Sequence, residues 1–153
     1  MPLVSVLSRG FSKALEDYAG RVHRLAEPLS DAQFWTKPYP YGNSFGHLVL
    51  HLTGNLNYYL GAQLAGTGYV RDRPREFAET ARLSKEEVLG AFDEAVAVAL
   101  RAVELQTAET WGAPYEAENT QLEARFDIVL NCVSHLNHHV GQMIYLTKQL
   151  SLH

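Results

Sequence analysis

Two pairs of histidines, each four residues apart, are the side chains of this sequence best suited to chemistry. They are His47 with His51, and His135 with His139. On a helix such residues lie on one face with Cβ atoms about 5–6 Å apart, so two imidazoles can bind one metal ion. A helical projection places His51, His135 and His139 at the edges of apolar arcs and His47 and His138 further from them. A third ligand could therefore come from the other helix and leave a fourth position open for water or substrate.

The simpler alternative is that the histidines are ordinary core or surface residues, because one such pair arises readily by chance. Two pairs in one chain favour the metal site, since burying four imidazoles without partners would be costly. Histidine ligands suit zinc, nickel, iron and copper alike. We expect a divalent ion, with zinc or nickel first. Cys132 lies one turn before His135 and could add a thiolate, although a free cysteine is usually a small buried apolar residue.

Three further polar positions could contact a metal ligand or a substrate. Asn55 lies one turn beyond His51 and could reach either, or could be a surface amide. Arg71 and Arg73 could bind an anionic substrate near the metal, or a subunit partner. The simpler interpretation is a solvated loop whose charge Asp72 and Glu76 partly neutralise.

The elements that must position these residues are predicted to be helices. Apolar residues recur every three or four positions along four stretches, and no strand-like alternation of useful length appears. The predicted helices span residues 3–26, Asn43 or Ser44 to about Leu64, Ser84 to about Gln106, and about Gln121 to Leu150. Ser84 and Glu87 form a predicted capping box. We therefore predict an all-α four-helix bundle in one domain, residues 1–153, whose long connections allow the second and third helices to run parallel.

Composition excludes several classes of protein. The chain has 153 residues, of which 46% are hydrophobic and 20% charged, as in ordinary globular domains. Its net charge of −4 lacks the basic character of a nucleic-acid-binding protein. One cysteine excludes an internal disulfide and fits a reducing compartment. We see neither a signal peptide nor an apolar run of about 18 residues, so we expect a cytoplasmic protein that binds neither nucleic acid nor membrane.

Three segments resemble DinB-like proteins. Ser44 to Asn55 is similar to the second-helix signature of that family and His135 to Ile144 to its fourth-helix signature, while Arg71 to Phe77 resembles an arginine-rich segment of one branch. The resemblance spans the whole chain. It implies a four-helix bundle with helices two and three parallel, usually a homodimer. It also implies a divalent metal held by three histidines, here His51, His135 and His139. At His138 the branch usually shows tyrosine, so His138, like His47, is a further candidate for the site.

The same resemblance implies a possible activity, because the superfamily includes transferases that use low-molecular-weight thiols such as bacillithiol or mycothiol. We expect a metal-dependent transfer of a thiol to an electrophilic small molecule, since a metal lowers the pKa of a bound thiol. A metal-dependent hydrolase is a neighbouring alternative, although no carboxylate base stands out. The other is a non-catalytic metal-binding dimer with a structural or stress-response role, which a fourth protein ligand such as His47 would favour.

Overall fold

The computed structural model describes residues 1–80, 83–117 and 121–152, and these ranges are helical with no strand. The four long helices are α1 (Leu3–Ala26), α3 (Phe45–Leu56), α5 (Lys85–Glu104) and α7 (Arg125–Leu150). The short ones are α2 (Asp31–Trp35), α4 (Arg73–Ala78), α6 (Ala108–Trp111) and a π-helical turn, η1 (Asn57–Ala62), that continues α3. One isolated antiparallel bridge joins Pro114 to Ala124. The predicted all-α class is confirmed.

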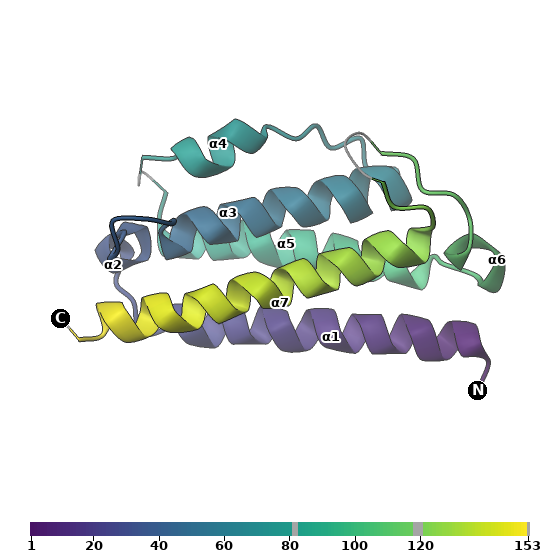
Figure 1. Ribbon diagram of the computed structural model, residues 1–153, viewed down its shortest axis with the longest axis horizontal. Coiled ribbons are helices and arrows are strands. Elements are labelled where there is room, and N and C mark those ends of the chain that lie inside the picture. Colours follow the sequence, from purple (N-terminus) through teal and green to yellow (C-terminus); the bar gives the residue numbers. More distant parts are fainter. Residues whose placement is uncertain (81–82, 118–120, 153) are drawn as a thin grey trace.

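The long helices form a bundle of two parallel pairs (Figure 1). Helices α3 and α5 run in the same direction side by side, and α1 and α7 run together in the opposite direction. Helix α1 also packs on α5, and α3 on α7, which closes the bundle. The prediction that the second and third long helices are parallel is therefore confirmed. Helix α4 lies outside the bundle against α3.

Side-chain caps set the starts of two of these helices. The Ser44 hydroxyl accepts a hydrogen bond from the backbone N–H of His47 at 3.1 Å, so the second predicted helix starts where expected. The predicted capping box is confirmed: Ser84 accepts from the backbone of Glu87 at 3.1 Å, and the Glu87 carboxylate accepts from the backbone of Ser84 at 2.8 Å.

One predicted boundary is wrong, and one predicted connection contains a short helix. The last helix begins at Arg125 rather than at Gln121, because the backbone just before it pairs with residues 113–115 instead: Tyr115 N–H donates to the Glu123 carbonyl at 3.0 Å. The connection over 67–82 also contains α4, which has proline at its first turn and Asp72 as its cap, accepting from the backbone of Arg75 at 3.2 Å.

The core lies between the four long helices and is built from leucine, valine, alanine and phenylalanine side chains. Helix α2 rests on the start of α3 at Gly46, where a Cβ atom would lie 2.8 Å from the Trp35 ring and 2.9 Å from the Phe34 ring. Glycine is thus required there by close packing. No helix in the described ranges has the length and apolar character needed to cross a membrane.

We expect Gly46→Ala to destabilise the fold by about 1–3 kcal/mol, because rigid aromatic rings must move to admit the methyl group. Gly10→Ala is the matched control. Gly10 lies within α1 with nothing near its would-be Cβ, so this change should stabilise by about 0.5–1 kcal/mol. Urea denaturation of both variants measures the difference, and equal midpoints would contradict the packing argument.

Candidate metal centre

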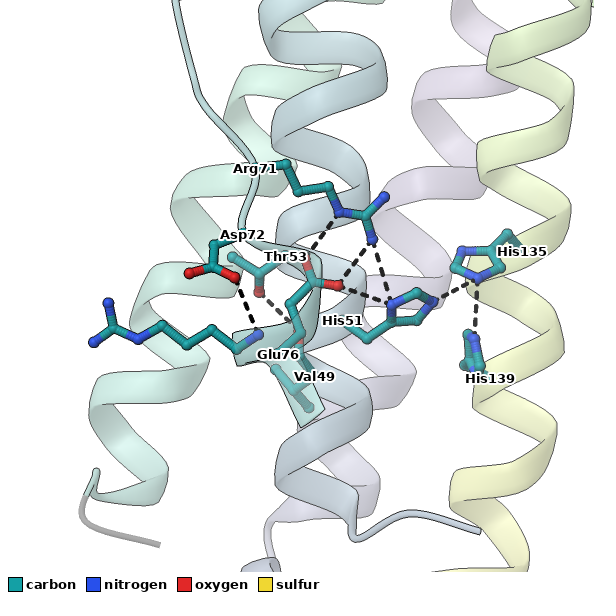
Figure 2. Close-up of polar contacts among 9 residues, drawn as sticks. Val49, His51, Thr53, Arg71, Asp72, Glu76, His135 and His139 are labelled. Carbon is teal, nitrogen blue, oxygen red and sulfur yellow. Dashed lines mark hydrogen bonds and ion pairs between the residues drawn. The ribbon is translucent and has the colours of Figure 1, made fainter. Parts of the chain in front are cut away.

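Three histidines from two helices meet at one point. His51 comes from α3, and His135 and His139 from successive turns of α7 (Figure 2). The Nε2 atom of His135 lies 3.1 Å from Nε2 of His51 and 3.0 Å from Nε2 of His139. One potential ligand nitrogen from each ring lies within 4.8 Å of the other two. The structure thus brings together the three histidines that the sequence singled out.

Hydrogen bonds on the far side of two rings determine where their protons lie. His51 Nδ1 is 3.0 Å from the Glu76 carboxylate, which can only accept, so Nδ1 carries the proton and Nε2 presents its lone pair to the centre. His139 Nδ1 is 2.7 Å from Gln142 Oε1 and is oriented in the same way. His135 Nδ1 is buried and has no hydrogen-bond partner among the residues described.

The three ring nitrogens that meet at the centre have too few protons to satisfy one another's lone pairs. Two lone pairs point at Nε2 of His135, and a neutral imidazole can place one proton there and donate it to one of them. A cation between the three nitrogens would satisfy all three lone pairs. Nitrogens on one tetrahedral zinc ion, each ~2.0–2.1 Å from the metal, lie about 3.3 Å apart. The observed separations of 3.0 and 3.1 Å are close to this value, so the residues fit a divalent metal.

The surroundings favour neutral rings, which metal binding requires. Burial lowers the pKa of His135 to about 3, and the neighbouring His139 and His51 add to the shift. Burial also lowers the pKa of His139; the hydrogen bond with Gln142 opposes this, and the nearby His51 contributes to it. Around neutral pH both rings are therefore available as ligands.

Behind His51 lies a buried ion pair. Arg71 holds the Glu76 carboxylate with two hydrogen bonds, Nε to Oε2 and Nη2 to Oε1, both 2.9 Å long. The side chains of Arg71 and Glu76 are only 10% and 7% exposed. Burial alone would raise the pKa of Glu76, but hydrogen bonds from His51 and Arg71 and the charge of Arg71 outweigh it, so this pKa is lowered. Glu76 is thus ionised at neutral pH.

A cavity of about 900 Å³ opens beside the triad. Its walls come from α3, η1, the 69–73 segment and α7, and they include His51 and His135. Three tyrosines line it, Tyr58, Tyr59 and Tyr69. The volume is in the range of small-molecule sites, so a ligand could reach the nitrogens of the triad from this side.

Other candidate residues lie outside the triad. His47 has both ring nitrogens engaged, Nδ1 with the Ser44 hydroxyl at 2.6 Å and Nε2 with the Glu79 carbonyl at 2.7 Å, so it is not placed to be a fourth ligand. His138 is exposed and lies beside Gln142. Cys132 is buried, and burial raises the pKa of its thiol to about 12, so it does not present a thiolate.

The remaining polar candidates all lie at the cavity and differ in their exposure to solvent. Asn55 and Arg73 line the cavity, Asn55 being buried and Arg73 exposed. The solvated-loop interpretation is wrong for Arg71, because the carboxylate of Glu76 draws it inward. Sequence reasoning placed Glu76 in that loop and missed its role. A hint was its position after the arginines of the segment that resembles DinB-like proteins.

The chain is similar to one known family and to solved structures. The model of the DinB superfamily matches residues 14–143. A conserved protein from Enterococcus faecalis shares the fold with a TM-score of 0.77 and 16% identity over 95% of this chain and 98% of that one. A DinB-like protein from Bacillus cereus matches with a TM-score of 0.73 and 15% identity over 92% and 91% of the two chains. No match is found among curated proteins.

We predict one divalent metal ion per chain, lost on replacing any of its three ligands. Each of the variants His51→Ala, His135→Ala and His139→Ala should lower zinc affinity at least tenfold, because only two of the three imidazole ligands would remain. His138→Ala is the matched control and should bind like the wild type. Competition with a chromophoric chelator gives the affinities. Loss of metal in His138→Ala but not in His139→Ala would refute the assignment.

We also predict that the metal-free protein loses stability as the pH falls from 7 to 5. Unfolded histidines take up protons near pH 6.5, whereas His135, and to a lesser degree His139, stay neutral below that value in the fold. The unfolded state then binds more protons, so acid favours it. Glu76 contributes little here, because its stabilisation is lost only below pH 4.5. Urea midpoints should fall less in His135→Ala than in His138→Ala, and an equal fall would contradict this account.

Proposed function

We propose that this chain, which belongs to the DinB superfamily, is a metal-dependent transferase that joins a small thiol to an electrophilic small molecule. The observation that carries the proposal is the open side of the triad. Three imidazoles converge beside a large cavity, and among the described residues no fourth His, Cys, Asp or Glu completes the group. Such a site has room for an exogenous ligand.

The three histidines would hold the ion, and because an imidazole binds a metal in its neutral form, they would leave the charge of the ion undiminished. A divalent metal bound there would supply a positive charge that stabilises a thiolate at neutral pH. The protein's own part is to position the reactants. Tyr69 keeps its proton as a hydrogen-bond donor, since burial raises the pKa of its phenol.

Arg73 is the cation best placed to bind a carboxylate of the thiol or of the acceptor. It lines the cavity, its guanidinium lies 5.8 Å from the centre of the Phe77 ring, and it forms no ion pair with the residues described. Arg71 also lines the cavity, but its charge is already matched by Glu76. We therefore assign substrate recognition to Arg73 rather than to Arg71.

The geometry gives less support to the two alternatives. A hydrolase needs a base for water, and both oxygens of Glu76 are occupied by His51 and Arg71. The described wall of the cavity holds no carboxylate. A non-catalytic metal site was expected to show a fourth ligand such as His47, which binds Ser44 and Glu79 instead.

A homodimer is part of the proposal and rests on the resemblance to DinB-like proteins. Leu3 and Val6 of α1 and Leu130 of α7 are large apolar side chains exposed to solvent. A second copy of the chain could cover them.

We expect metal-loaded protein to conjugate a carboxylate-bearing thiol with a chlorinated nitroarene faster than the uncatalysed reaction. A carbon–sulfur bond forms, chloride leaves with the bonding electrons, and the thiol proton passes to solvent. His139→Ala should abolish the acceleration, whereas Arg73→Ala should raise KM for the thiol several-fold. His138→Ala should keep wild-type activity. No acceleration with any of several thiols, with metal bound, would refute the transferase.

A further inference from the structure

We infer that Glu76 is a positioning residue for the metal centre, which fixes the tautomer and ring orientation of His51 from a notch in α3 at Gly54. The inference rests on metal binding by the triad, as in the proposed function, but not on thiol transfer. It concerns a residue 25 positions along the chain from the ligand it holds.

The contacts form one continuous line across the site. Arg71, Glu76, His51 and His135 follow one another from the segment before α4 to α7 (Figure 2). Each step is a contact of 2.9–3.1 Å: Arg71 to Glu76, Glu76 to His51, and His51 to His135. A carboxylate bonded to the outer nitrogen of a metal-binding histidine holds the ring in place and makes its other nitrogen a stronger ligand.

Gly54 is the structural requirement that makes this arrangement possible. A Cβ atom at Gly54 would overlap Oε2 of Glu76 and lie 2.7 Å from its carboxyl carbon. Any side chain at this position would therefore push the carboxylate out of its place beside His51. Glycine at position 54 makes room for the carboxylate and not for a neighbouring helix of the bundle, since the nearest atoms belong to Glu76 and Arg71.

The charge of Glu76 is too buried to stand alone. An unpaired carboxylate at this depth would be strongly destabilising, and Arg71 compensates it through two parallel hydrogen bonds. Arg71 also reaches within 3.4 Å of His51 Nδ1. Arg71 Nη2 donates to Oε1, the same oxygen that faces His51. At 3.0 Å that oxygen lies closer to His51 Nδ1 than Arg71 does, so we assign the proton of His51 to Nδ1.

A purely structural role is the competing explanation, in which Glu76 merely anchors α4 to the bundle. Asp72 distinguishes the two roles. It caps α4 through the backbone of Arg75 and makes no hydrogen bond to Glu76 or to the histidines. Asp72→Ala therefore weakens α4 but removes none of the contacts that join Arg71, Glu76, His51 and His135.

The test compares Glu76→Gln, Gly54→Ala and Asp72→Ala in the full-length protein. Zinc affinity by chelator competition should fall 10- to 100-fold in the first two variants and stay within about twofold in Asp72→Ala. In Gly54→Ala every metal ligand and Glu76 itself are retained, so a loss there reports on position. Thermal unfolding of the metal-free variants checks that each is folded.

A second readout does not depend on metal. Long-range ¹H–¹⁵N spectra of the metal-free protein should show His51 protonated at Nδ1 in the wild type and in Asp72→Ala, with a shift toward Nε2 protonation in Gly54→Ala. Wild-type affinity and an unchanged His51 tautomer in Gly54→Ala and Glu76→Gln would overturn the inference, as would equal weakening in all three variants. If the wild type binds zinc and the variants bind it weakly, absence of thiol transfer counts against the proposed function alone.

Discussion

The structure of the site depends on the meeting of three imidazole rings at the contact between α3 and α7, where outer hydrogen bonds turn the unprotonated nitrogens of His51 and His139 toward His135. Neutral rings in a half-buried position are the cheapest way to bring three basic groups together, since three imidazolium ions would repel one another. The cost is that the lone pairs of His51 and His139 face a single ring nitrogen of His135, which can donate a proton to only one of them. The arrangement therefore demands both a close α3–α7 contact and outer hydrogen bonds that keep the protons of His51 and His139 on the far side of their rings.

The topology of the bundle supplies both requirements. Two parallel pairs of helices need a long crossover between α3 and α5. In this chain the crossover also builds part of the site, because it returns along α3 and brings Arg71 and Glu76 next to His51. The same length of chain that allows the parallel arrangement provides the wall of the cavity and the hydrogen-bond partner of His51.

Much of this could be predicted from local patterns. Helical periodicity and breakers defined four long helices, because both signals arise within one helix. The i, i+4 spacing and the apolar arcs, together with the resemblance to DinB-like proteins, singled out His51, His135 and His139, which the structure brings together. Glu76 could not be placed in this way. Its role depends on how a crossover of irregular backbone folds back, and its neighbours looked like a solvated charged loop. The start of α7 was misplaced because the backbone of residues 123–125 pairs with that of residues 113–115, a contact that helical periodicity does not reveal.

The burial of Cys132 has a consequence for a protein proposed to handle electrophiles. Its thiol is 1% exposed and protonated at neutral pH, since burial raises its pKa to about 12. Alkylating agents react with exposed thiolates, so the native protein offers them no thiolate of its own: this is the chain's one cysteine. Burial in the core thus protects the Cys132 thiol from alkylation, and this thiol becomes reactive only when the bundle opens.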